Sequence, residues 1–135
     1  MIRGTRFTAI TLGVLGVLGA CSSLDARPPH LPLHDRSIMN SVLISGELTR
    51  HGQCLFLASD DGSTYGVAWP ADRTTWDAGA NRLVVGKLAA APGDHVELGA
   101  AHEDDLDGLA VAPLPECMGD SFIYAGGFAS VGATD

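Results

Sequence analysis

The sequence predicts an all-β protein, namely a small, partly closed antiparallel barrel of OB-like type with five or six short strands. Three observations support this fold class. Short runs of alternating apolar and polar residues recur after residue 40, glycine, proline and aspartate separate these runs, and few stretches have a helical period.

The first three strands are expected within residues 42–69. Residues 42–49 alternate apolar and polar side chains, which predicts a strand with one wet face, and residues 54–58 are apolar on both faces, which predicts a central strand. Asp60, Asp61 and Gly62 predict a hairpin turn, because aspartate-glycine suits the positive φ angles of such turns. A third strand then runs over residues 64–69 and stops at Pro70.

The rest of the chain carries weaker signals. Residues 71–81 are interpreted as a loop, and residues 83–88 and 95–98 as a strand pair joined through Pro92, Gly93 and Asp94. An acidic segment at 102–107 leads to residues 109–115, for which a short helical turn and an irregular crossing are both open. A last strand begins at residues 122–124 and fades into glycine and alanine.

The N-terminus has the layout of a secretory signal peptide. Arg3 and Arg6 precede an uncharged apolar stretch that begins at Phe7. This stretch is shorter than the about 20 apolar residues that a membrane-spanning helix needs. The chain is therefore expected to be exported rather than to span a membrane.

The end of that stretch reads Leu18, Gly19, Ala20, Cys21, which resembles the lipobox of bacterial lipoproteins. The resemblance implies a diacylglyceryl group on Cys21 and cleavage between Ala20 and Cys21. Two or three acyl chains hold a protein stably on a membrane, whereas one chain does so only marginally. The alternative is a chance cysteine at the end of an ordinary signal peptide or anchor helix.

Three regions follow from this interpretation: a lipoprotein signal peptide at 1–20, a flexible tether at 21–39 and a single β domain at 40–135. The tether is polar and contains Pro28, Pro29 and Pro32, so an extended form would hold the domain on the order of 50 Å from the bilayer. The expected location is the periplasmic face of the outer membrane in a Gram-negative cell. In a Gram-positive or actinobacterial cell it is the outer face of the cytoplasmic membrane.

The charge of the mature chain excludes some partners. Removing Arg3 and Arg6 from the eight basic residues leaves six against sixteen acidic ones, a formal charge of −10. Nucleic acid binding rests on lysine and arginine contacts to phosphates, so no nucleic acid partner is expected. Direct electrostatic docking on anionic lipid is disfavoured for the same reason.

If Cys21 carries lipid, Cys54 and Cys117 remain as a pair in a compartment where disulfides persist. Their spacing is unlike Cys-x-x-Cys, which favours a structural bridge over a redox centre. Two unpaired buried thiols are the competing interpretation.

A set of residues spread over roughly residues 42 to 131 resembles a family of small uncharacterised exported bacterial proteins, many of them actinobacterial. The resemblance implies a disulfide-tied β domain and brings no activity with it. It rests on Gly52, Cys54, Leu55, Leu57, Asp61, Gly62, Tyr65, Trp69, Pro70, Thr75, Trp76, Gly93, Asp94, Val96 and Cys117.

Catalytic and metal motifs are weak. Gly119, Asp120, Ser121 and Phe122 resemble the nucleophile block of one esterase class, but no histidine follows Ser121 to act as its base. The acidic segment misses the alternating ligands of a calcium loop. The candidate metal ligands have no diagnostic spacing; they are His51, His95, His102, Glu103, Asp104, Asp105 and Asp107.

Aromatic side chains are the remaining candidates for ligand contact. Tyr65 and Trp76 are a candidate ligand surface, with a core position as the alternative, and Trp69 is assigned to the core. The sequence thus predicts a non-enzymatic envelope lipoprotein without a cofactor that binds or supports another envelope component. The alternative is a barrel that binds a small ligand or saccharide near Trp76 and assists an envelope enzyme.

Overall fold

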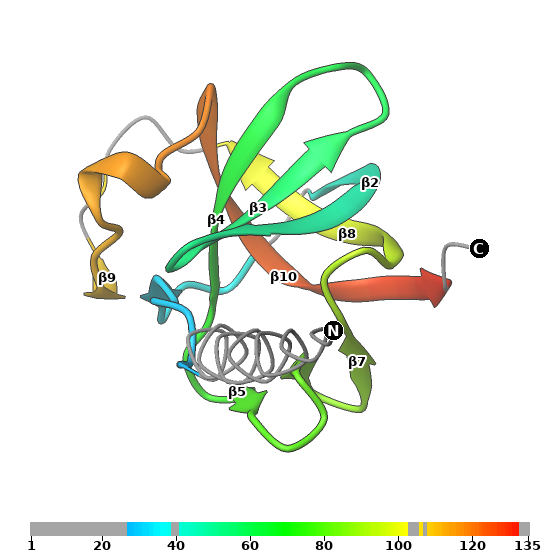
Figure 1. Cartoon of the computed structure of the whole chain (residues 1–135). Helices are drawn as coiled ribbons and strands as arrows, with labels where there is room; N and C mark the ends of the chain where they lie inside the picture. Colours follow the sequence, from blue (N-terminus) through cyan, green and yellow to red (C-terminus); the bar gives the residue numbers. More distant parts are fainter. Residues whose placement is uncertain (1–26, 39–40, 103–105, 107, 133–135) are drawn as a thin grey trace, which may run out of the picture.

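The structure is a computed structural model that describes residues 27–38, 41–102, 106 and 108–132. Within these residues it is all-β, as predicted, and its one helical element is the 3-10 turn η2 (Pro115–Cys117) (Figure 1). The strands are β1 (Leu33–His34), β2 (Val42–His51), β3 (Cys54–Ser59), β4 (Thr64–Pro70), β5 (Thr74–Asp77), β6 (Arg82–Val85), β7 (Leu88–Ala90), β8 (His95–His102), β9 (Leu109–Val111) and β10 (Ser121–Gly132).

Five strands form a ring in the order β10-β8-β2-β3-β4, and β4 pairs back to β10. The closing pair is parallel and short, running from Ser121 opposite Tyr65 to Tyr124 opposite Ala68, whereas the other ring pairs are antiparallel. The ring is therefore partly closed and is not a barrel, and its closing pair departs from the predicted antiparallel arrangement. Two of its strands are longer than predicted, since β2 has 10 residues and β10 has 12.

The ring strands alternate between an inner and an outer face, as a period of two requires. On β3 and β4, Leu57, Val67 and Trp69 belong to the inner core. Phe56 and Ala68 belong to separate apolar clusters on the outer face. The central strand at 54–58 is confirmed, because β3 pairs with β2 on one side and β4 on the other.

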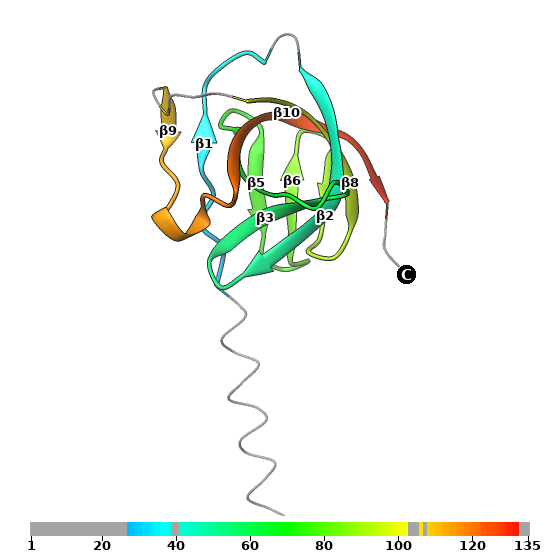
Figure 2. The same cartoon turned by 90° about the horizontal axis from the view of Figure 1, so that it is seen from above.

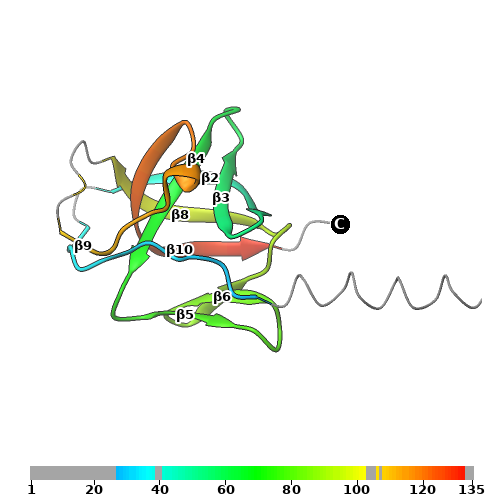
Figure 3. The same ribbon diagram turned by 60° about the vertical axis from the view of Figure 1, so that its left-hand side comes forward.

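A second sheet, β5-β6-β7, adds Leu83, Val85 and Ala90 to the inner core (Figure 3). Two predictions are wrong here: residues 71–81 contain β5, and β8 pairs with β2 and β10, not with β6. The cause is a two-residue turn at Gly86, whose φ of 64° lets β6 fold back onto β7 before the chain reaches β8. Local alternation does not reveal which partner a strand will choose.

The strap, residues 27–38, pairs through β1 with the end of β4, and its Leu31 and Leu33 pack against the inner core (Figure 2). Its Ile38, together with Leu109 and Met118 of the connection that contains β9 and η2, covers the apolar cluster on the outer face. The predicted tether at 21–39 is thus wrong over its described part. At the end of β4 the strap accepts two backbone hydrogen bonds: Trp69 N–H donates to Pro32 O at 2.9 Å, and Ala71 N–H donates to His34 O at 2.9 Å. Pro32 can take part because proline lacks the N–H but keeps the carbonyl.

The connection after β8 settles the alternatives left open at 109–115. Residues 109–111 form β9, which pairs antiparallel with β1, and the 3-10 turn follows at Pro115–Cys117. Most of the acidic segment, residues 103–105 and 107, lies outside the described residues.

Candidate functional site

The lipidation and cleavage residues, Cys21 and Ala20, lie outside the residues that the structure describes. Across the described ranges no helix has the length and apolarity needed to cross a bilayer.

The predicted disulfide is present between Cys54 on β3 and Cys117 in η2, with the Cα atoms 5.2 Å apart. Both cysteines are buried and pack with Phe56 and Leu114. As expected, the bridge ties the second ring strand to the connection before the last strand, and it fixes that connection onto the outer face.

Tyr65 and Trp76 do not form one surface. Tyr65 is 9% exposed within the inner core, and its ring meets His102 edge-on at 5.8 Å. Trp76 is half-buried on β5, and the guanidinium carbon of Arg50 lies 5.7 Å from the centre of its ring. Trp69 is in the core as predicted, with 1% of its surface exposed.

The histidines do not gather. In the described part of the chain no three histidine, cysteine or acidic side chains form a metal-binding group. His95 contacts Asp60 at 3.0 Å, while His51 packs on Phe56 at the far end of β2. The acidic residues at 103–105 and 107 lie outside the residues that the structure describes.

The block at Ser121 has a structural role. The Asp120 carboxylate accepts a hydrogen bond from Thr64 N–H at 2.9 Å, and Asp120 N–H donates to Thr64 O at 2.7 Å. These two bonds clamp the start of β10 to the start of β4. Ser121 itself is exposed at the first position of β10.

A groove that the sequence did not predict crosses the outer face of β8 and β10. It has a volume of about 290 Å³. Leu43 on β2, Gly99 on β8 and Gly127 on β10 stand opposite one another across three strands, so two of the three positions present bare backbone. The groove is lined by Ile38, Ser41, Gly99, Gly126, Gly127, Phe128 and Ala129.

A carboxylate is fixed next to the groove. Glu97, two residues before Gly99 on β8, accepts from Ser130 Oγ at 2.8 Å and from Ser45 Oγ at 3.4 Å. These serines come from the strands on either side of β8, so the negative charge is held at the middle of the three strands.

An unpaired strand edge borders the groove. β2 pairs with β8 from Val42 onward, but its pairing with β3 begins only at Gly46. Ser45 O accepts from Asp60 N–H on the β3 side at 2.9 Å, so the backbone groups of Leu43, two residues earlier, point to that same side. Among the described residues no strand pairs with Leu43 there, and its side chain is 64% exposed.

A second, polar cavity of about 350 Å³ lies beside the strap. Two side chains that line this cavity donate hydrogen bonds to the middle of β10, where the register shifts between Ala125 and Gly127. His34 Nε2 donates to Ala125 O at 2.7 Å, and Arg73 Nη2 donates to Gly126 O at 2.8 Å. The lining consists of His34, Asp35, Arg36, Ser37, Ile38, Pro70, Asp72 and Arg73.

Glycines inside strands are the one sequence signal for the groove. Glycine in a strand weakens it and marks a bulge or a close approach by another group. Gly99, Gly126 and Gly127 stand in segments otherwise apolar enough for strands.

Comparisons with protein-family models, with curated proteins and with solved structures found no match for this chain.

Proposed function

We propose that this protein is an exported lipoprotein, cleaved after Ala20 and anchored through lipid on Cys21, whose β domain is a non-enzymatic binding module for another envelope protein. The observation that carries the binding role is the groove over Gly99 and Gly127, with exposed Leu43 on one side and Glu97 beside it.

The chemistry of the groove specifies the partner. Bare glycine backbone admits an apolar or aromatic side chain, and the carboxylate of Glu97 favours a positive charge next to it. Glu97 and Gly99 are two residues apart on one strand, which is about 7 Å. The partner is therefore an extended segment that carries a lysine or arginine beside an apolar residue, and the formal charge of −10 on the cleaved chain favours such a basic segment.

The free edge of β2 supplies the binding mode. An exposed edge with apolar side chains is a template for a further strand, and peptide recognition by strand addition uses such edges. Leu43 offers both its N–H and its C=O on that side, and Val42 is 55% exposed next to it. The partner segment pairs with the free backbone groups of Leu43 and lies beside the groove.

The polar residues singled out in the sequence support a non-enzymatic role. Asp120 clamps two strands together, and His95 is paired with Asp60. The groove at Gly99, and not the half-buried Trp76, carries the binding proposal, so the saccharide alternative near Trp76 is not carried forward.

The binding proposal is tested by site-specific photo-crosslinking in the cell envelope. A photoreactive phenylalanine analogue at position 43 should capture a partner whose cross-linked peptide contains a lysine or arginine next to an apolar residue. Gly99→Trp fills the groove, and the new Cβ meets only Ser41 within 4 Å, at 3.5 Å or more, so it clashes with no backbone. It should abolish the cross-link.

Thr75→Trp is the matched control, since it adds the same side chain at an exposed position on β5 and should leave the cross-link intact. A cross-link that persists in Gly99→Trp, or a captured peptide without a basic residue, contradicts the proposal. The address is tested separately by palmitate labelling, which should be lost in Cys21→Ala.

A further inference from the structure

The strap is fixed to the fold from its first described residue. Arg27 O accepts a hydrogen bond from the guanidinium of Arg50, at the end of β2. His30 N–H donates to Gln53 O at 2.8 Å, and His30 Nε2 lies 2.7 Å from Ala112 O. The chain thus enters the domain at the β2–β3 turn.

Only six residue steps separate Cys21 from Arg27 in the sequence. A fully extended chain covers at most about 3.3 to 3.6 Å per residue, so Cys21 lies within about 20 Å of Arg27. The headgroup region of a bilayer takes about 5 to 8 Å of that reach. A lipid on Cys21 therefore leaves little room between this end of the domain and the membrane.

We propose that, in the lipidated protein, the end of the fold formed by Arg27, Arg50 and Trp76 lies against the headgroup surface of an anionic bilayer. This inference rests on the proposed lipid attachment at Cys21 and adds an orientation to it. The binding groove then belongs to a domain held at the membrane surface, not on a long tether.

The side chains at this end suit a membrane interface. Trp76 is half-buried, with its ring beneath the Arg50 guanidinium at 5.7 Å. Tryptophan has an apolar body with one polar N–H, and arginine keeps its charge in water while its stem covers apolar surface, so both are common at headgroup depth. On β6, which pairs with the strand that carries Trp76, Arg82 is half exposed beside its partner Asp77, at 3.7 Å.

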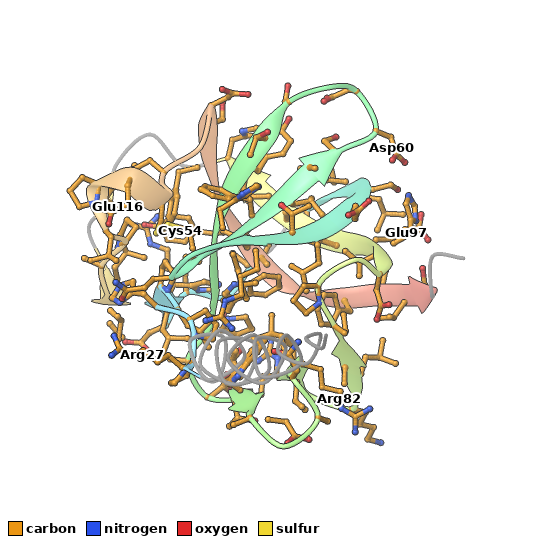
Figure 4. All side chains as sticks on the ribbon, viewed as in Figure 1. Arg27, Cys54, Asp60, Arg82, Glu97 and Glu116 are labelled. Atoms are coloured by element: carbon orange, nitrogen blue, oxygen red, sulfur yellow. A yellow bond between two sulfur atoms is a disulfide. The ribbon has the colours of Figure 1, made fainter. Side chains whose placement is uncertain are left out.

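The net negative charge of the chain opposes contact with an anionic bilayer, but the charges are unevenly distributed over the domain. Figure 4 shows Arg27 and Arg82 in the lower half of the domain and Asp60 at its upper right. β3 alone separates the Gln53 end from Asp60 by six residues, about 20 Å. Salt screens charges beyond about 8 to 10 Å, so Asp60 at the far end of β3 adds little repulsion at the basic end, where Asp77 is paired with Arg82.

The test uses the full lipidated protein in vesicles of phosphatidylethanolamine and phosphatidylglycerol that contain a headgroup-depth fluorescence quencher. Trp76 emission should be quenched, while emission from Trp69, which is 1% exposed, should persist. Trp76→Phe should therefore remove the quenchable fraction. Trp69→Phe, checked for folding by circular dichroism, should retain it.

A linker variant tests the geometry directly. A flexible glycine-serine insert of about 20 residues between Ser23 and Leu24 lengthens the tether and should release Trp76 from the quencher. If the wild-type protein carries no lipid, the proposed function fails at its anchor. If it is lipidated and vesicle-bound but Trp76 is not quenched, or the insert changes nothing, the orientation alone is overturned.

Discussion

His34 in the strap donates a hydrogen bond from Nε2 to the carbonyl of Ala125 in β10, 91 residues later, at 2.7 Å. Its Nδ1 lies 3.1 Å from Arg36 N–H, which donates to it, so both ring nitrogens have backbone partners. The side chain is 1% exposed and packs on Tyr124 at 5.2 Å. The strap, which the sequence predicted to be a tether, therefore holds β10 at the point where its register shifts.

Replacing His34 should destabilise the fold. His34→Phe leaves the Ala125 carbonyl and the Arg36 N–H without their partner, and an unpaired buried group costs about 1 to 3 kcal/mol. We expect the free energy of unfolding, measured by urea denaturation, to fall by about 2 to 3 kcal/mol. His30→Phe removes a comparable bond at a more exposed site and should cost under about 1 kcal/mol. Equal losses in the two variants would contradict the role of His34.

Reducing the disulfide should weaken the fold by a large fraction of its stability. Cys54 and Cys117 are 63 positions apart, and a closed loop of this size contributes about 4 kcal/mol on the chain-entropy model. Urea midpoints of the oxidised protein and of the reduced, alkylated protein should differ accordingly. An unchanged midpoint would show that the packing of η2 on β3 holds without the bond.

The sequence was sufficient where pairing is local. β3, the turn at Asp60–Gly62 and β4 form a hairpin whose alternation and turn residues lie within seventeen positions, 54 to 70. The Gly62 φ of 95° is the positive angle that the turn needs. The all-β class and the cysteine pair followed from equally direct signals.

The sequence was insufficient where contacts are distant. The strap forms only two strand residues, Leu33 and His34, and pairs with β4 and β9, so it has no alternating pattern to detect. Gly126 and Gly127 interrupt β10 and resemble a loop, yet pairing with β8 carries the strand on to Gly132. The groove arises from the register of three strands, which no single segment encodes.

Asp61 should titrate below its ordinary range. Ser63 N–H donates to Asp61 Oδ1 at 2.8 Å, and this bond, followed by the Ser59 hydroxyl, lowers the pKa of the exposed Asp61 carboxyl from 3.8. A depressed folded-state pKa adds stability above the unfolded value, and that stability is lost as pH falls through the folded value. Carboxyl NMR should give a midpoint below 3.8, and Ser59→Ala should raise it. A midpoint at or above 3.8 in the wild type would exclude this turn geometry.

Replacing Gly66 by alanine should destabilise the fold, whereas replacing Gly99 by alanine should not. A Cβ on Gly66 in β4 would lie 2.5 Å from Cys117 O and 2.6 Å from Met118 O, where η2 crosses the outer face. Gly66→Ala must push that backbone away, and overpacking of this kind costs about 1 to 3 kcal/mol. A Cβ on Gly99 in β8 meets Ser41 Oγ at an ordinary 3.5 Å. Since glycine is the poorer strand residue by about 0.5 to 1 kcal/mol, Gly99→Ala should leave stability unchanged or raise it. Thermal unfolding of the two variants checks the contrast: a stable Gly66→Ala protein would mean that η2 is not seated on β4.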